Sequence, residues 1–355
     1  MQELSETHVG SGRAMTVRGP VDTASLGLTL MHEHILNDCR CWWHRPQEPE
    51  RQMLAHAPVT AGILGELRMD PFAVLDNCTL NEEAVAIAEL QQFAAAGGVT
   101  VVDPTCRGIG RSPDALVRIA AATGLQIIMG SGYYLQTSHP ARLAGLTADD
   151  VADEIVAEAR DGVAGTGVRI GLIGEIGVSS DFTPAEKKSL RGAARAQRRT
   201  GLPLMIHLPA WFRLGNEALD LIEAEGADPR HTVLCHMNPS GEDIAYQTSL
   251  ARRGAFIEYD MIGMDYWYAD QQVQCPSDED NARAISRLVE AGLARQILLS
   301  QDVFLKMMLT KYGGFGYAYV LKHFVPRLRR HRISEDTIRL MLVDNPRRVF
   351  DSRAA

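Results

Sequence analysis

Two histidines separated by one residue, His32 and His34, end an apolar run from Leu28 to Ile35. In a β-strand, residues two apart point to the same side, so both imidazoles would face one point. Two neutral imidazoles that converge in this way form half of a site for a divalent metal such as zinc. An isolated H-x-H is weak evidence, because a chain with eleven histidines can contain it by chance. The pattern becomes informative if further ligands lie at equivalent strand ends.

Four more candidate ligands follow apolar runs further along the chain. The segments VRIGLIGE, LPLMIH, HTVLCH and RQILLSQD end in, or next to, Glu175, His207, His236 and Asp302. A single buried histidine at a strand end is more often a hydrogen-bonded core residue, but six aligned residues favour a metal site. Six ligands exceed those of one catalytic zinc and fit two metals that share a bridging carboxylate. From the residue types alone, either Glu175 or Asp302 can bridge, and a bridging hydroxide would be the nucleophile.

The elements that must position these residues alternate regularly. The sequence predicts eight short apolar strands, each followed by a helix, with a long loop (37–81) after the first strand. Apolar strands that alternate with helices indicate a parallel sheet covered by helices. Eight such units fit a (β/α)8 TIM barrel, whose active sites lie at the carboxyl ends of the strands. No G-x-G-x-x-G follows the first strand, which argues against a dinucleotide-binding sheet.

We expect one metal-dependent hydrolase barrel domain over residues 1–355, because no linker or low-complexity segment interrupts the chain. Residues 1–27 form a lead-in, with a short hairpin around 15–21, and an extra C-terminal helix covers about 334–343. The loop 37–81 begins with a stretch rich in Trp, His, Pro and Arg. Loops of this length in compact domains are usually functional or disordered, and the aromatic content favours function.

Composition excludes several classes of protein. The formal net charge of −8 argues against a nucleic-acid or anionic-membrane partner. No apolar run approaches the ~18 residues of a transmembrane helix, and the polar start of the chain shows no secretory signal. Six cysteines in 355 residues are no disulfide framework. We therefore expect a cytoplasmic protein.

The motifs together resemble the phosphotriesterase-related family of the amidohydrolase superfamily, over essentially the whole chain. The resemblance rests on TLMHEH, GEIG, MIHLP, LCHMN, LLSQD, the segment KYGGFGYAYVLKHFVPRLRR and the closing VDNPRRVF. It implies two divalent metal ions bridged by residue 175. His32, His34 and Asp302 would bind the more buried ion, and His207 and His236 the more exposed one. The resemblance also makes Asp302 the proton shuttle.

Two positions depart from the best-known members. Those members bridge their metals with a carboxylated lysine, but no lysine occurs between 168 and 178, and Glu175 stands there instead. The chain is therefore similar to the branch with a glutamate bridge. Members that hydrolyse acylated homoserine lactones carry an arginine just past strand 7, where Met261 stands. Both departures argue against organophosphate or quorum-signal hydrolysis as the main activity.

Candidate substrate contacts lie beyond the strand ends. Tyr134 resembles a family tyrosine and could donate a hydrogen bond to a carbonyl oxygen, although packing on the barrel rim is equally consistent with its position. Aromatic residues that could wall an apolar pocket are Trp42, Trp43, Trp211, Tyr266 and Trp267. Of these we single out Trp211 and Tyr266 as substrate contacts. Arg45, Arg213 and Lys306 could bind a substrate anion, but surface solvation is the simpler interpretation.

The predicted function is a binuclear metal hydrolase acting on a small-molecule substrate. The bond expected first is an ester or lactone, then an amide or N-acyl compound, with phosphotriester cleavage as a side activity. A different class is a non-catalytic protein that holds metal and a hydrophobic small molecule. Zinc is the expected metal, with manganese, cobalt or iron as alternatives, and the resemblance suggests a homodimer.

Overall fold

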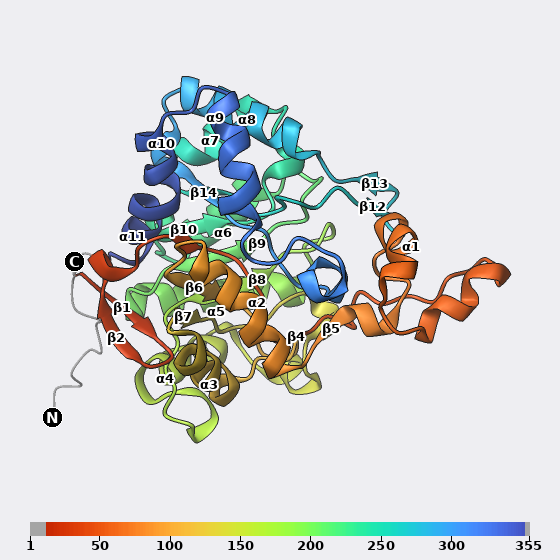
Figure 1. Cartoon of the computed structure of the whole chain (residues 1–355). Helices are drawn as coiled ribbons and strands as arrows, with labels where there is room; N and C mark the ends of the chain where they lie inside the picture. Colours follow the sequence, from red (N-terminus) through yellow and green to blue (C-terminus); the bar gives the residue numbers. More distant parts are fainter. Residues whose placement is uncertain (1–11, 352–355) are drawn as a thin grey trace, which may run out of the picture.

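Eight short parallel strands form the centre of the computed structural model, which describes residues 12–351 (Figure 1). They form two hydrogen-bonded runs. One run is β3 (Thr29–Leu30), β6 (Thr100–Asp103) and β7 (Gln126–Met129); the other is β8 (Ile173–Gly177), β9 (Leu204–His207), β10 (Thr232–Leu234), β11 (Phe256–Tyr259) and β14 (Ile297–Leu299). Backbone hydrogen bonds connect the runs at both seams, from Gly171 to Met129 and from Asp302 to His32, each at 3.0 Å. The predicted TIM barrel is confirmed.

Helices follow the strands and cover the outside of the barrel (Figure 1). They are α2 (Glu83–Ala95), α3 (Pro113–Thr123), α4 (Ala148–Asp161), α5 (Pro184–Thr200), α6 (Gly215–Ala224), α7 (Ile244–Arg252), α8 (Asp278–Glu290) and α9 (Val325–Arg330). Local sequence explains their ends, as in α5. Thr183 and Glu186 form a capping box around Pro184 in the first turn, and Gly201 ends the helix with φ of 70°.

Side chains alternate between two apolar layers along each strand. Val101 and Ile127 face the helices, whereas their neighbours Val102 and Ile128 belong to a separate interior cluster. Each of the eight strand segments supplies at least one residue to this interior: Met31, Val102, Ile128, Leu172, Met205, Val233 with Cys235, Phe256 and Leu298. The barrel is therefore a packed core, and its polar chemistry is confined to the strand ends.

The first and last described segments of the chain pack against the barrel. The expected hairpin is present as β1 (Arg13–Thr16) and β2 (Gly19–Asp22), while residues 1–11 of the lead-in lie outside the described residues. The C-terminal helix begins as α10 (Glu335–Arg339) and passes through a wide turn into α11 (Asn345–Phe350). The predicted end near residue 343 is therefore too early, because Val349 and Phe350 continue the helix and pack in the interior cluster.

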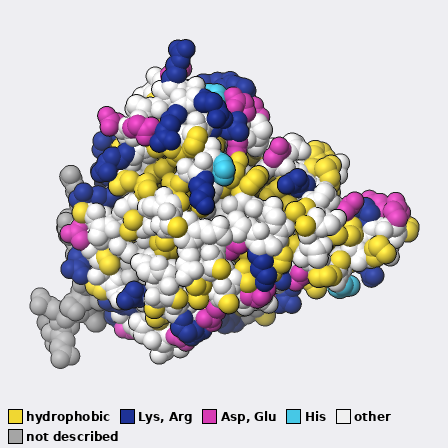
Figure 2. All heavy atoms as spheres, in the orientation of Figure 1, with side chains coloured by type: hydrophobic (Ala, Val, Ile, Leu, Met, Phe, Trp, Pro, Cys, Tyr) yellow, Lys and Arg dark blue, Asp and Glu magenta, His cyan; other side chains and the backbone are white. Residues whose placement is uncertain are grey.

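The segment 37–81 is a folded excursion. Its ends pair as the antiparallel strands β4 (Asn37–Asp38) and β5 (Thr79–Leu80). Between them, α1 (Leu64–Met69) and three 3-10 helices (Pro49–His56, Ala61–Ile63 and Leu75–Cys78) project beside the hairpin β12 (Trp267–Tyr268) and β13 (Val273–Gln274) (Figure 1). Hydrophobic side chains are frequent over this projection, whereas Lys and Arg gather over α8 to α10 (Figure 2). Within residues 12–351, no helix is both long and apolar enough to cross a membrane.

Candidate metal centre and active-site cavity

The six predicted ligands lie together at the carboxyl end of the barrel. They are His32, His34, Glu175, His207, His236 and Asp302; Glu175 lies within β8, and the others lie at or just after the ends of β3, β9, β10 and β14. Each is at most 9% exposed. The structure thus brings together residues from five strands that are separated by as many as 270 positions in the sequence. We refer to these six residues as the ligand cluster.

Glu175 lies between two pairs of histidines. Its Oε1 is 3.2 Å from Nε2 of His34, and its Oε2 is 3.5 Å from Nε2 of His32. On the other side, Oε2 is 3.1 Å from Nδ1 of His207 and 3.7 Å from Nε2 of His236. In each of the two sets, the ligand atoms lie within 4.8 Å of one another. Glu175 is the member that the two sets share.

Asp302 completes the cluster beside the first pair of histidines. Its Oδ1 is 3.5 Å from Nε2 of His32 and 3.3 Å from Nε2 of His34. Among the described residues, Oδ1 of Asp302 and Nε2 of His32 are buried without a hydrogen-bond partner. Leaving such atoms unpaired costs free energy, and a bound cation would satisfy both. Imidazoles and carboxylates are also the donors that zinc and its neighbours prefer, so the cluster fits a metal site.

Electrostatics in the cluster favour positive charge. Burial lowers the pKa of His34, but hydrogen bonds to Asp302 and Glu175 outweigh it and raise the pKa to about 9. Burial also opposes the charged form of His236, yet Asp260 above all raises its pKa to about 10. For Glu175, burial raises the pKa and the surrounding histidines, His32 first, hold it well below its ordinary value. A divalent cation would be attracted by the same carboxylates.

Two ligands have backbone conformations that L-residues rarely adopt. His236 has φ of 59° and Asp302 has φ of 48°. Such residues cost about 1–3 kcal/mol each and persist where the surroundings hold them, often at functional sites. For Asp302 the holding group is Glu33, whose carboxylate accepts hydrogen bonds from the backbone N–H of Gln301 at 2.9 Å and Val303 at 2.8 Å. Glu33 thereby holds the backbone on both sides of Asp302.

Glu175 is positioned by the glycine that precedes it. Gly174 has φ of 125°, a conformation outside the range of ordinary side chains. A Cβ atom there would collide with the carbonyl oxygen of Met205 on the neighbouring strand. The GE pair of GEIG therefore serves close strand packing and ligand placement at once.

Asp260 lies beneath the cluster and was not singled out from the sequence. Its Oδ2 is 3.2 Å from Nδ1 of His32, and its Oδ1 is 3.1 Å from Nδ1 of His236. It also accepts the backbone N–H of His236 at 3.0 Å. Carboxylates in this position orient metal-binding imidazoles and select their tautomer. Asp260 ends the segment GAFIEYD, so the strand-end rule that identified the ligands could also have found it.

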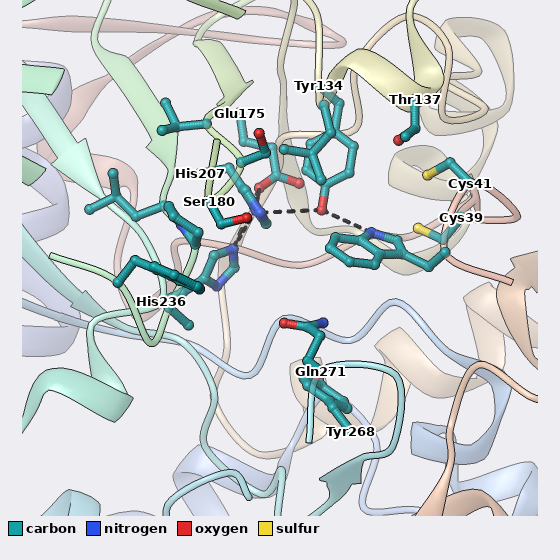
Figure 3. Close-up of a pocket in the computed structure, with 18 of the residues that line it drawn as sticks. Cys39, Cys41, Tyr134, Thr137, Glu175, Ser180, His207, His236, Tyr268 and Gln271 are labelled. Atoms are coloured by element: carbon teal, nitrogen blue, oxygen red, sulfur yellow. Dashed lines mark hydrogen bonds and ion pairs between the residues drawn. The ribbon is translucent and has the colours of Figure 1, made fainter. Parts of the chain in front are cut away.

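In His34 and His207, the ring nitrogen that points away from Glu175 lies next to a neutral hydroxyl group. Nδ1 of His34 is 2.8 Å from the hydroxyl of Thr105. Nε2 of His207 is 3.5 Å from the hydroxyl of Tyr134, which in turn accepts a hydrogen bond from Nε1 of Trp42 at 3.1 Å (Figure 3). Tyr134 therefore lies at the cavity side of the cluster, where a substrate oxygen could meet its hydroxyl.

A cavity of about 780 Å³ opens onto the cluster. All of the ligands except His32 line it. Its size is in the range of sites for drug-sized molecules. The excursion 37–81 contributes Cys39, Cys41, Trp42 and Phe72 to the lining. The aromatic-rich loop therefore forms part of the candidate active site.

The predicted substrate contacts are placed differently from one another. Tyr134 and Trp211 line the cavity. Tyr266 does not: it is buried beside a separate small cavity with Gly263. Tyr268, two residues further on in β12, lines the main cavity in its place. Of the other aromatic candidates, Trp42 lines the cavity, whereas Trp43 and Trp267 do not.

The fold and the site together define an α/β barrel with a buried histidine and carboxylate cluster at the carboxyl ends of its strands. The model of the phosphotriesterase family matches residues 12–350. The chain therefore belongs to the phosphotriesterase family, as the sequence motifs indicated.

Relatives within this family are named as hydrolases and as a binding protein. An N-acetyltaurine hydrolase of Salmo salar is 35% identical, covering 95% of this chain and 97% of the relative. A resiniferatoxin-binding protein from Rhodobacter sphaeroides is 65% identical, with a TM-score of 0.96, covering 99% of this chain and 98% of that chain. A lactonase from Listeria monocytogenes is 26% identical with a TM-score of 0.79, covering 96% and 100%.

Proposed function

We propose that the protein is a binuclear metal-dependent hydrolase that attacks the carbonyl carbon of a small ester or lactone. The observation that carries the proposal is Glu175, the carboxylate common to the donor set with His32 and His34 and the donor set with His207 and His236. Two divalent ions, when bound, would make a water molecule nucleophilic at neutral pH and polarise the carbonyl. Zinc suits the donors, and manganese, cobalt and iron are alternatives.

The chain's own residues would orient the reactants and move the proton. Asp302 lies at the edge of both the cluster and the cavity, so its carboxylate is placed to take a proton and pass it to the leaving group. Tyr134 could donate its hydroxyl proton in a hydrogen bond to the substrate carbonyl. Burial raises the pKa of Tyr134 well above its ordinary value, so this hydroxyl stays protonated at neutral pH.

An amide is the second candidate bond, because curated relatives that cover nearly the whole chain are named for cleaving an N-acyl compound. The same attack and proton transfer would serve an amide. A non-catalytic small-molecule binder is the alternative of another class, favoured by the resiniferatoxin-binding relative. A pure binder has no need of the complete ligand cluster, which makes hydrolysis the better account.

Proton release from a substrate panel tests the proposal. The panel contains aryl esters, γ- and δ-lactones, N-acyl amines and one phosphotriester. The protein is reconstituted in turn with zinc, manganese and cobalt, and chelator-treated protein is the blank. We expect metal-dependent proton release with one carbonyl class and two metal ions per chain. Binding of panel compounds without turnover, at two metals per chain, would contradict hydrolysis and favour the binder.

A further inference from the structure

Away from the ligand cluster, the cavity lacks a cationic side chain that could neutralise an anion. Among residues 12–351, no lysine or arginine lines it. The polar groups away from the ligand cluster are mainly amides, hydroxyls and thiols, including Gln136, Thr137 and Gln271. Burial raises the pKa of the Cys41 thiol to about 11, so this group is also neutral at pH 7. Beyond the cluster, a substrate would meet neutral polar atoms and apolar surface.

The cations that could have served an anionic substrate are engaged elsewhere or lie off the cavity. Arg213 pairs with Asp243 at 3.3 Å, and Lys306 pairs with Asp76. Arg45 is exposed and is not part of the lining. None of the three cationic candidates from the sequence therefore places a positive charge in the cavity.

The carboxylates of the cavity mouth add negative potential. Asp181 is exposed and lines the cavity. Glu186 also lines it, but its carboxylate accepts hydrogen bonds from Ser179 and Thr183 at the start of α5. An incoming anion would meet these carboxylates without a compensating cation, which disfavours its entry.

A continuous run of aromatic rings forms one side of the cavity. Trp42 stacks on Phe72 with centroids 5.5 Å apart, and Phe72 lies 5.2 Å from Tyr268. Tyr268 meets Trp211 edge to face at 5.6 Å. Phe304 lies 6.2 Å from Phe72 on the same side. We call these five residues the aromatic wall; it offers a large apolar surface to the part of the substrate that extends from the reacting carbonyl.

We infer that the substrate is electrically neutral and carries a bulky apolar group, and that N-acyl compounds ending in a carboxylate or sulfonate are excluded. An unpaired anion loses its hydration in an apolar cavity and gains no partner. The inference rests on the proposed function for the bond that is cleaved. It separates this chain from the relatives named for N-acetyltaurine, whose substrate ends in a sulfonate.

Gln271 supplies a neutral polar contact opposite the ligand cluster. It lies in the turn between β12 and β13, and its carboxamide points into the cavity towards Tyr134 and His207 (Figure 3). A carboxamide can donate to a carbonyl or accept from a hydroxyl of the substrate. The cavity can therefore accept a substrate whose apolar group carries one neutral polar substituent near Gln271.

Matched substrates that differ only in remote charge test the inference. One is a δ-lactone with an unbranched eight-carbon side chain, and the other has the same chain length ending in a carboxylate. Two amides are compared alongside them, N-acetyl-3-phenylpropylamine and N-acetyltaurine, which differ in both the charge and the apolar group. Because the charge is far from the lactone carbonyl, the two lactones have nearly equal intrinsic reactivity. We expect kcat/KM for the neutral lactone to exceed that of the anionic one by at least about 100-fold.

A variant with an added positive charge shows whether the lack of a cation in the cavity causes the lower kcat/KM of anionic substrates. Gln271→Arg should raise the anionic-to-neutral ratio of kcat/KM about tenfold. Gln274→Arg is the matched control, because it makes the same change on the same hairpin. The Gln274 side chain donates a hydrogen bond to Asp265 and does not line the cavity. Gln274→Arg should leave the ratio unchanged. Thermal midpoints of both variants verify folding.

The outcomes separate this inference from the proposed function. Equal kcat/KM for the two lactones, or an unchanged ratio in Gln271→Arg, would overturn the inference while hydrolysis stands. If neither lactone nor amide is hydrolysed, quenching of tryptophan fluorescence measures binding of the uncleaved compounds, because Trp42 and Trp211 line the cavity. If only the neutral compounds bind, the inference on substrate charge is supported although the proposed hydrolysis is contradicted. Equal binding of both would overturn the inference too.

Discussion

The ligand cluster and the aromatic wall line the same cavity but are built in different ways. The residues of the cluster come from the carboxyl-terminal part of the barrel strands. Each belongs to or follows an apolar run that can be recognised in the sequence. The wall comes from the excursion 37–81, the β12/β13 hairpin and the segments after β9 and β14. The cluster is polar and poised for a cation, whereas the wall is apolar.

This difference assigns separate tasks to the two regions. On the proposed function, the barrel end would determine the reaction, because its residues would hold the metal ions and transfer the proton. The loops determine which molecule reaches it, because they supply most of the remaining cavity surface. Changes in the cluster should therefore alter turnover, and changes in the wall should alter recognition.

Replacement of the Asp302 carboxylate should produce the largest effect. Asp302→Asn keeps the size and a metal-binding oxygen but removes the base, so kcat should fall by roughly 10²–10⁴. Steady-state kinetics measure the fall, and metal analysis and the thermal midpoint show whether the site and fold persist. Near-normal turnover in a metal-loaded variant would contradict the role of Asp302 in proton transfer. It would also contradict the assignment of catalysis to the cluster and recognition to the wall.

The support beneath the cluster should matter next. Asp260→Asn weakens the acceptor that holds Nδ1 of both His32 and His236, so metal affinity should fall by about 10–100-fold. Competition with a chelator measures the affinity. The control is Asp265→Asn, which makes the same change outside the cavity lining. Equal affinities in the two variants would show that Asp260 does not position the imidazoles.

Shortening the wall should alter recognition with little change in chemistry. Trp211→Ala removes an aromatic surface from the cavity, so KM for an apolar substrate should rise about tenfold while kcat stays near its original value. Trp43→Ala is the matched control, because Trp43 packs near His56 and does not line the cavity. A fall in kcat at constant KM would place Trp211 in the catalytic step instead.

A buried ion pair outside both regions should affect stability more than turnover. Glu158 accepts hydrogen bonds from both terminal nitrogens of Arg111 at 2.8 Å. Burial opposes its ionisation, but Arg111 and Ser131 prevail and hold the pKa of Glu158 below its ordinary value. The carboxylate therefore stabilises the fold above about pH 4.3 and loses this contribution as pH falls through the lower, folded-state pKa.

The corresponding variant is Glu158→Gln. It should lower the free energy of unfolding by about 1–3 kcal/mol at pH 7, and the difference should shrink below about pH 4. Denaturant unfolding at both pH values measures it. A difference that grows on acidification would contradict the depressed pKa.

Two predictions for the site show where sequence reasoning works and where it stops. His207 and Asp302 were expected in one cluster because the carboxyl ends of parallel strands meet at one end of a barrel, whatever their separation in the chain. Tyr266 was expected at the substrate, but Tyr268 lines the cavity. Which tyrosine of a short hairpin faces inward depends on how the hairpin lies against the excursion, and local sequence does not encode that arrangement.

The sequence by itself determined the eight-strand alternation, the residues at the strand ends and their donor chemistry. These follow from local periodicity and from the geometry that all such barrels share. The family resemblance had already pointed to Glu175 as the shared carboxylate, but only the tertiary structure revealed that Asp260 and Glu33 contact their neighbours in the cluster. It also decided that Arg213 and Lys306 pair away from the cavity. These relations depend on distances between segments remote in the chain, and such distances exist only once the loops have packed.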